Sequence, residues 1–127
     1  WSQGQALFAA GLQFPEVEMN GRTFYPGQAN HFYIFPALGL AVYATCPKHI
    51  TDDMVIETAR ALADQVDPAS RERGRLFPPQ SDILEVSVTS AARIAEFIFD
   101  QGAATVERPK DIRAWIESLT YSPRYAG

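Results

Sequence analysis

Apolar residues recur at helical spacing over most of this chain, and the pattern predicts a mainly helical structure. Residues 30–44 are apolar on every side, as in a buried helix, and Pro36 is tolerated only near the first turn. A second helix begins at Thr51, a preferred N-cap residue, and Asp67-Pro68 stops it. Its apolar residues repeat at helical spacing: Val55, Ala59, Leu62 and Val66.

Two further helices are predicted after a polar and then proline-rich segment that we expect on the surface. The third helix begins at Asp82, which forms a capping pair with Glu85, and Gly102 ends it. The fourth helix begins after Pro109, and Pro123 ends it. Both helices carry an apolar stripe: Ile83, Val86, Ala91, Ile94 and Ile98 on the third, and Ile112, Trp115, Ile116 and Leu119 on the fourth.

Strand signals are confined to the first part of the chain. Residues 6–10 form an apolar run that predicts a buried core strand. Asn20-Gly21 lies between two short segments with strand character, and this dipeptide is typical of the type I′ turn that closes a hairpin. A buried parallel strand needs neighbours, and only residues 22–25 weakly resemble one. We therefore expect this chain to be a piece of a longer protein, with more helix than strand.

Composition narrows the classes of partner. The 127 residues supply one domain's worth of material, with 46% hydrophobic residues and a net charge of −4. An acidic balance argues against nucleic acid, which is bound through a basic surface. The longest apolar run, residues 32–46, is interrupted by Pro36, so we expect no membrane partner. Cys46 is the single cysteine, and we expect it to be a small buried apolar residue.

Candidate chemistry is concentrated in residues 25–36, which read Tyr-Pro-Gly-Gln-Ala-Asn-His-Phe-Tyr-Ile-Phe-Pro. Pro26-Gly27 signals a turn, and Asn30 is a good N-cap residue just ahead of the apolar run. Such a segment directs free backbone N–H groups and one short amide side chain at a common spot, which suits an anionic or hydroxylated ligand. An ordinary capped helix is the alternative interpretation of the same pattern.

Other polar residues favour structural roles. His49 is expected at the surface, and Asp52-Asp53 fits the first turn of a helix better than a metal site. No Gly-x-Gly-x-x-Gly turn occurs in the sequence, so the chain alone is not expected to hold a pyrophosphate. Further charged residues are expected to be solvated, with a phosphate contact left open for the arginines: Glu16, Glu18, Arg71, Arg73 and Arg75.

Blocks of sequence along nearly the whole chain resemble the malic enzymes. Residues 25–36 are similar to the family's Pro-Gly-Gln-Gly-Asn-Asn-x-Tyr-x-Phe-Pro-Gly segment, near the end of its dinucleotide-binding domain. Residues 6–11 with Phe14-Pro15 resemble its Ala-Ser-Gly-Ser-Pro-Phe segment. Residues 74–79, Gly-Arg-Leu-Phe-Pro-Pro, and residues 85–87, Glu-Val-Ser, resemble Gly-Arg-Leu-Tyr-Pro-Pro and Glu-Val-Ser. The order and spacing of these blocks fit the family.

The resemblance implies an α/β fold, the C-terminal portion of a Rossmann-like NAD(P)-binding domain, mainly helical in this chain. The chain would then be a single partial domain, with residues 1–66 closing the NAD(P)-binding domain and residues 67–127 continuing into a helical C-terminal region. The implied reaction is oxidative decarboxylation of malate to pyruvate and CO2 with reduction of NAD or NADP, assisted by Mg²⁺ or Mn²⁺. A homo-oligomer in the cytoplasm is implied, or in the mitochondrial matrix of a eukaryote.

The resemblance also implies site residues, each matched to one position of this sequence. Asn30 falls on the family's malate-contacting asparagine and is a candidate contact of the cofactor as well, and His31 replaces a second asparagine near the nicotinamide. Gly11 belongs to the turn that lines the cofactor pocket, although Leu12-Gln13 replaces the usual Ser-Pro, and Ala29 replaces a glycine. The family's catalytic Tyr and Lys, metal carboxylates and glycine-rich turn all precede this region. No catalytic residue or metal ligand is therefore assigned, and the isolated chain is expected to be inactive.

A non-catalytic module is the alternative interpretation to the enzyme. Amphipathic helices dominate the chain, so a non-catalytic helical module that binds a ligand or another protein would show the same pattern. A Gly-x-Gly-x-x-Gly turn and paired carboxylates encoded upstream of Trp1 would decide for the enzyme. The unpaired strand and the apolar helix faces also predict self-association of the isolated chain.

Overall fold

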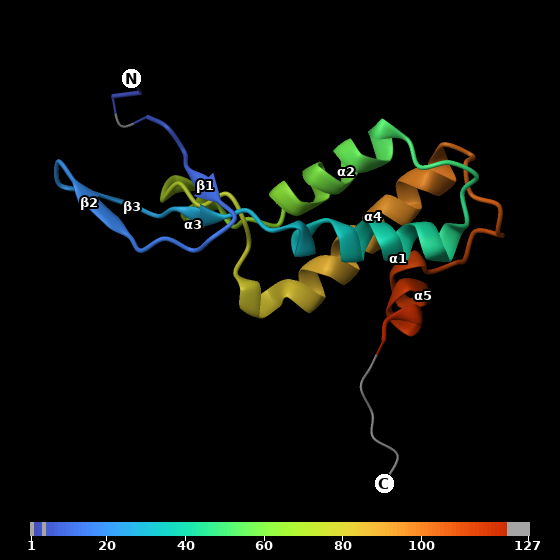
Figure 1. Cartoon of the computed structure of the whole chain (residues 1–127). Helices are drawn as coiled ribbons and strands as arrows, with labels where there is room; N and C mark the ends of the chain where they lie inside the picture. The colour runs from blue at the N-terminus through green and yellow to red at the C-terminus, as the bar shows by residue number, and fades with distance from the viewer. Residues whose placement is uncertain (1, 4, 122–127) are drawn as a thin grey trace, which may run out of the picture.

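Helices make up about half of the described residues, and the longest helix packs against the other main helices (Figure 1). The computed structural model describes residues 2–3 and 5–121. The longest helix contacts the three other main helices along its length. The four are α1 (Phe35–Thr45), α2 (Asp52–Ala63), α4 (Ile83–Asp100) and α5 (Ile112–Leu119). The predicted mainly helical α/β chain is confirmed.

The core lies where α1, α2 and α5 meet α4. Small side chains from α1 and α4 meet there without exposed surface, which lets the two helices pack closely. Larger side chains, Ile94 and Ile98 from α4 and Ile116 from α5, fill the centre with no exposed surface. The small residues are Ala37, Ala41, Ala91 and Ala95. No helix in the described part of the chain is both long enough and apolar enough to cross a membrane.

Helix ends follow the local sequence signals. Pro36 lies in the first turn of α1, as predicted. The Thr51 side chain caps α2 by accepting the N–H of Met54 at 3.4 Å. Gly102 ends α4 with a φ of 64°, and its N–H donates to the carbonyl of Phe99 at 2.9 Å. A left-handed residue in this position satisfies the last carbonyls of a helix, which explains the glycine.

The start of α4 differs from the prediction. A short 3₁₀ helix, η2 (Gln80–Asp82), leads directly into α4, and the Asp82 side chain makes no capping hydrogen bond to the helix. Its carboxylate accepts the hydroxyl of Ser81 at 2.9 Å instead. The predicted capping pair is therefore wrong, because the preceding 3₁₀ turn already supplies the entry into the helix. A further short helix, α3 (Pro68–Glu72), lies in the expected surface segment.

The buried face of α2 is also displaced from the prediction. Leu62 is buried as expected, but Val55 is 44% exposed and Ala59 is exposed. Met54 and Thr58 take the positions against the core. The pattern misled because Thr58 looks polar, whereas its hydroxyl donates to the Met54 carbonyl at 2.8 Å and is thereby satisfied within the helix. The predicted fourth helix is α5, which ends at Leu119. Pro123, which was expected to end it, lies outside the described residues.

Strands are short and form two separate pairs. β2 (Val17–Met19) and β3 (Arg22–Phe24) form an antiparallel hairpin that projects away from the helices in Figure 1. Its turn residues, Asn20 and Gly21, have φ values of 54° and 72°, which confirms the predicted hairpin. The other pair is parallel: β1 (Ala9–Ala10) and β4 (Gly27–Gln28).

The predicted buried strand over residues 6–10 is wrong in extent and burial. Only Ala9 and Ala10 pair, while Leu7 and Phe8 are 59% and 55% exposed. The reason is that β4 is the single strand paired with β1 in the described part of the chain. A two-stranded pair this short offers little surface on which apolar side chains can be buried.

Cys46 is exposed rather than buried, which corrects the expectation from its apolar neighbourhood. It is the C-cap residue of α1, with a φ of 47° and a ψ of 50°. This left-handed conformation turns the chain out of the helix, and Thr45 occupies the buried position just before it. The Cys46 thiol donates to the carbonyl of Tyr43 at 3.3 Å.

Candidate functional site

The parallel pair brings together two segments that are distant in sequence. The N–H of Gly27 donates to the carbonyl of Phe8 at 2.9 Å, and the N–H of Ala29 donates to the carbonyl of Ala10 at 2.8 Å. Gly11, which follows β1, therefore lies beside residues 29–31, which follow β4. Ligands of α/β proteins bind outside the carboxyl ends of parallel strands, and the predicted residues Gly11, Asn30 and His31 follow these two ends.

Asn30 has the extended backbone of an N-cap residue, with a φ of −130° and a ψ of 139°. Its Oδ1 accepts the N–H of Phe32 at 3.1 Å, so it is an N-cap residue, as predicted. It caps the 3₁₀ helix η1 (His31–Tyr33), however, and the predicted helix over residues 30–44 is divided, since α1 begins at Phe35. The amide nitrogen makes no hydrogen bond to any other described residue. A cap that uses only the oxygen leaves two N–H donors for a ligand, so the structural and the ligand-binding roles are compatible.

His31 and Gly11 are both exposed at the same edge. The imidazole of His31 lies edge-on to the ring of Phe35, with ring centroids 5.9 Å apart and an interplanar angle of 62°. A side-chain atom added at Gly11 would lie 4.0 Å from the Ala29 carbonyl, which is ordinary contact distance. The glycine thus keeps this edge open without being required by the space around it.

A hollow of about 400 Å³ opens beside Asn30 and His31. One side is formed by the residues that follow β4, and the other by α2 and by Leu76-Phe77. Its lining is mostly apolar, so the Asn30 amide and the His31 imidazole supply the side-chain hydrogen bonds that a ligand would find there. The lining residues are Ala29, Asn30, His31, Tyr33, Ile34, Ala59, Leu62, Ala63, Leu76 and Phe77.

Three of the sequence blocks contact one another at the site: residues 6–11, 25–36 and 74–79. The hydroxyl of Tyr33 donates to the carbonyl of Pro78 at 2.6 Å, and its ring stacks on Phe77 at 5.3 Å. Gln28 donates to the Gly11 carbonyl at 3.3 Å and accepts a hydrogen bond from Gln80. Tyr33 and Gln28 support the site, and the sequence did not predict this role for either residue. Both lie within residues 25–36, the segment that carries the family resemblance, and this position was the signal that could have identified them.

Burial raises the pKa of the Tyr33 hydroxyl above its ordinary value. The hydroxyl therefore stays protonated and remains a hydrogen-bond donor to Pro78 across the neutral range. Tyr33 is 2% exposed, so an unpaired hydroxyl here would carry the desolvation cost of a buried polar group.

The described residues do not fit a divalent metal site. Within residues 2–3 and 5–121, no three histidine, cysteine or acidic side chains gather closely enough to hold a metal ion. Asp52 and Asp53 lie in the first turn of α2, as predicted, and His49 is exposed. Arg71 is exposed, as predicted, and donates to the Ala63 carbonyl at 2.6 Å. Arg75 lies over the ring of Tyr25 at 5.1 Å.

The comparisons with known proteins agree with these blocks. The family model for the NAD-binding domain of malic enzyme matches residues 1–99. The chain is 40% identical over 125 residues to an NADP-dependent malic enzyme of Dictyostelium discoideum, covering 98% of the chain and 23% of that protein. It is 42% identical over 127 residues to the NADP-dependent malic enzyme of Anas platyrhynchos, covering 98% of the chain and 23% of that protein.

A plant relative matches equally well. The chloroplastic NADP-dependent malic enzyme 4 of Arabidopsis thaliana is 40% identical over 126 residues, covering 98% of the chain and 20% of that protein. The chain therefore spans about a fifth of the length of these relatives. With a family model that matches most of the chain and the resembling blocks in contact around the carboxyl ends of β1 and β4, the chain belongs to the malic enzyme family and carries part of its Rossmann-like NAD-binding domain.

Proposed function

We propose that the polypeptide to which these residues belong catalyses the oxidative decarboxylation of malate to pyruvate and CO2 with reduction of NAD or NADP. The observation that carries this proposal is the identity of about 40% to malic enzymes over 98% of the chain. The relatives' NADP dependence makes NADP the first cofactor to test. When bound, the nicotinamide accepts the hydride from C2 of malate.

Asn30 is the residue we assign to malate. Its amide nitrogen has no hydrogen-bond partner among the described residues, while its oxygen accepts the N–H of Phe32 at 3.1 Å, so the donor has a fixed direction before any ligand arrives. An amide donates to a carboxylate or hydroxyl oxygen without adding a charge. Fixing the side chain in advance lowers the entropy lost on binding.

We assign His31 and Gly11 to the cofactor side of the same edge. The exposed imidazole of His31 is able to donate one hydrogen bond, in place of the asparagine amide that the family has there. Gly11 leaves room for a ligand to approach the carboxyl end of β1. The described residues do not form a site for Mg²⁺ or Mn²⁺, so we assign this chain no metal-dependent step.

Replacing Asn30 in the full-length enzyme tests the proposal. Asn30→Ala removes the free donor, and a hydrogen bond to a charged group is worth about 1.5–3 kcal/mol, so kcat/KM for malate should fall roughly 10- to 100-fold. Asn30→Ser is the matched control for the cap, because serine also caps helices but lacks the amide. It should keep thermal stability near that of the wild type and still lose activity.

The outcomes separate the two classes of function. Malate-dependent reduction of NADP or NAD by the wild-type full-length protein supports the enzyme, and a fully folded protein without this activity would leave the non-catalytic module. Unchanged kcat/KM in both Asn30 variants of an active enzyme would remove Asn30 from the malate site.

A further inference from the structure

We propose that Tyr33 is a positioning residue, which holds the Asn30 amide in place by fastening η1 to the backbone at Phe77-Pro78. This inference rests on the proposed function, since it concerns the residue that we assign to malate. The Tyr33 hydroxyl is bound to the Pro78 carbonyl and is not a ligand-binding group. It acts on the site through Asn30.

The contacts of Tyr33 reach in both directions. Its backbone N–H donates to the Asn30 carbonyl at 3.1 Å, so the two residues share one turn of 3₁₀ helix. Its hydroxyl donates to the Pro78 carbonyl at 2.6 Å, across 45 residues of sequence. Its ring lies nearly parallel to that of Phe77, with an interplanar angle of 15° and 5.3 Å between centroids. Tyr33 therefore joins the turn at Asn30 to a segment that is remote in sequence.

Asn30 depends on such an anchor because its own turn is short. η1 contains three residues, and 3₁₀ hydrogen bonds have poorer geometry than those of an α-helix. The Oδ1 of Asn30 is bound to the N–H of Phe32 inside this turn, so any rotation of η1 changes the direction of the amide. With Tyr33 fixed at Pro78, the turn cannot rotate without breaking a buried hydrogen bond.

A second link from the same remote segment holds the other side of Asn30. Gln28, two residues earlier, accepts a hydrogen bond from Gln80 and donates to the Gly11 carbonyl at 3.3 Å. Residues 77–80 thus contact the chain both before and after Asn30. Phe77 also packs against β4, since a side-chain atom built on Gly27 would lie 3.3 Å from its ring. These contacts set the position of the turn that carries Asn30.

The test is a double-mutant cycle in the full-length enzyme between Tyr33→Phe and Asn30→Ala. Tyr33→Phe removes only the hydroxyl, and a misplaced binding group should raise the KM for malate about 3- to 10-fold while the KM for the dinucleotide stays within about 2-fold. If Tyr33 acts through Asn30, the same substitution should change the KM for malate by less than about 2-fold in the Asn30→Ala background. An equal increase in both backgrounds would overturn the proposal.

Thr45→Val is the matched control. The Thr45 hydroxyl is fully buried and donates to the Ala41 carbonyl at 2.7 Å, at the end of α1 remote from Asn30. This variant therefore also loses one buried hydroxyl–carbonyl hydrogen bond, but should leave the KM for malate unchanged. An increase like that of Tyr33→Phe would mean that lost stability alone explains the effect, and would overturn the positioning role.

A measurement without substrate keeps this inference separate from the proposed function. In the full-length protein labelled with ¹⁵N at its asparagine side chains, the amide signals of Asn30 should shift in Tyr33→Phe and stay in place in Thr45→Val. This result does not depend on malate oxidation. Unmoved Asn30 signals in Tyr33→Phe would refute the positioning role even for an active enzyme, whereas shifted signals in an inactive protein would leave it standing and count against the proposed reaction.

Discussion

Two regions of this molecule both carry large apolar side chains but differ in how far they bury them. In the helical body, formed by α1, α2, α4 and α5, side chains such as Ile94 and Ile116 have no exposed surface. In the strand region, residues 5–28, Leu7 and Phe8 are more than half exposed, and each strand has two or three residues. Apolar sequence alone therefore does not produce a core.

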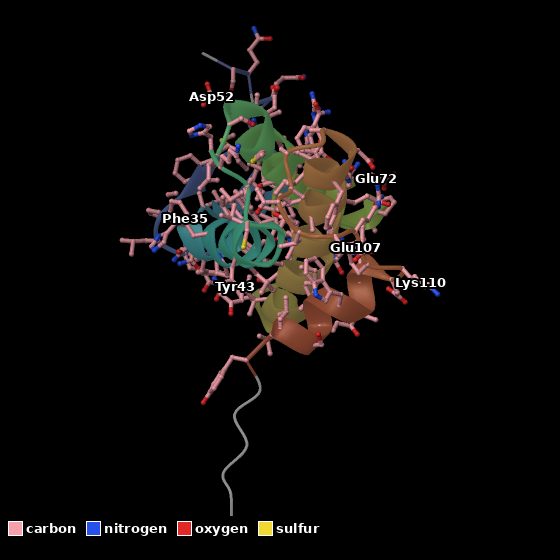
Figure 2. The ribbon with its side chains drawn as sticks, turned by 90° about the vertical axis from the view of Figure 1, so that its right-hand side faces the viewer. Phe35, Tyr43, Asp52, Glu72, Glu107 and Lys110 are labelled. Atoms are coloured by element: carbon pink, nitrogen blue, oxygen red, sulfur yellow. The ribbon has the colours of Figure 1, made fainter. Side chains whose placement is uncertain are left out.

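The difference follows from how each element satisfies its backbone. A helix forms its hydrogen bonds within itself and needs only one neighbour to cover its apolar face. α4 offers that neighbour to three helices at once. A strand needs paired strands on its edges and a covering layer on its faces, and β1 has the two-residue strand β4. Figure 2 shows that α1 keeps some large side chains outside the core, with Phe35 and Tyr43 lying on its outer side.

Ion pairs are distributed in the same unequal way. Arg93 of α4 donates to Glu57 of α2 at 2.7 Å and to Asp64 at 2.6 Å. Arg113 of α5 donates to Glu85 of α4 at 2.7 Å. Among the described residues, no ion pair involves a position before Glu57. Ion pairs between helices therefore add to the packing of the helical body. The strand region has no comparable ion pairs among the described residues.

The largest expected effect comes from emptying the core of the helical body. Ile94→Ala removes a side chain with no exposed surface and should lower the free energy of unfolding by about 2–5 kcal/mol. Leu84→Ala is the control on the same helix, because Leu84 is 72% exposed, and it should change stability by less than about 0.5 kcal/mol. Urea unfolding followed by circular dichroism measures both. Similar midpoints for the two variants would contradict the assigned core.

The same substitution placed in each region should sharpen the comparison. Gly102 and Gly21 have φ values of 64° and 72°, and a side-chain atom added at either would meet nothing within 4 Å, so alanine costs only backbone strain, about 1–2 kcal/mol. Gly102→Ala ends α4 poorly and should lower the global free energy of unfolding by about 1 kcal/mol. Gly21→Ala should instead open the β2–β3 hairpin locally and leave global unfolding nearly unchanged.

Hydrogen exchange and denaturation together distinguish these effects. Faster exchange confined to the β2–β3 hairpin in Gly21→Ala would support a locally stable hairpin that is uncoupled from the helices. A global loss in Gly21→Ala as large as that in Gly102→Ala would show that the strand region folds as one unit with the helical body.

The smallest expected effect is a pH dependence at the surface link between α2 and α4. A hydrogen bond from Arg93 holds the pKa of Asp64 below its ordinary value. The folded pKa lies below the unfolded one, so this contribution to stability is present above the unfolded pKa and is lost as the pH falls through the folded pKa. The side chain is exposed, so the effect on stability should be slight.

Titration by NMR measures this contribution directly. Arg93→Met should move the pKa of the Asp64 carboxyl toward its ordinary value. Asp67 is the internal control, because its pKa is lowered by hydrogen bonds from Ser70 and not by Arg93. An Asp64 pKa that stays low in Arg93→Met, or an Asp67 pKa that moves with it, would show that Arg93 is not the cause.

Most local signals were predicted correctly from the sequence, because the hydrogen bonds that satisfy them are local. The Asn30 cap, the Thr51 cap, the Asn20-Gly21 turn and the Gly102 helix end each involve backbone groups within a few residues. Two predictions failed for local reasons, the Asp82–Glu85 capping pair and the burial of Cys46. The others failed where a distant partner decides the outcome. The burial of residues 6–10 depended on strands beside β1, and the buried side of α2 depended on where α4 lies.

The sequence by itself determined the family, the Asn20-Gly21 turn and the caps at Asn30 and Thr51, since each depends on the order of nearby residues. Only the tertiary structure decided that Gly11 and Asn30 meet at one edge, and that Tyr33 reaches Pro78 across 45 residues. Such contacts depend on how β1 pairs with β4 and how η1 packs on residues 77–78. No local pattern encodes them, because the free energy that closes these long loops comes from burying side chains supplied by both distant segments.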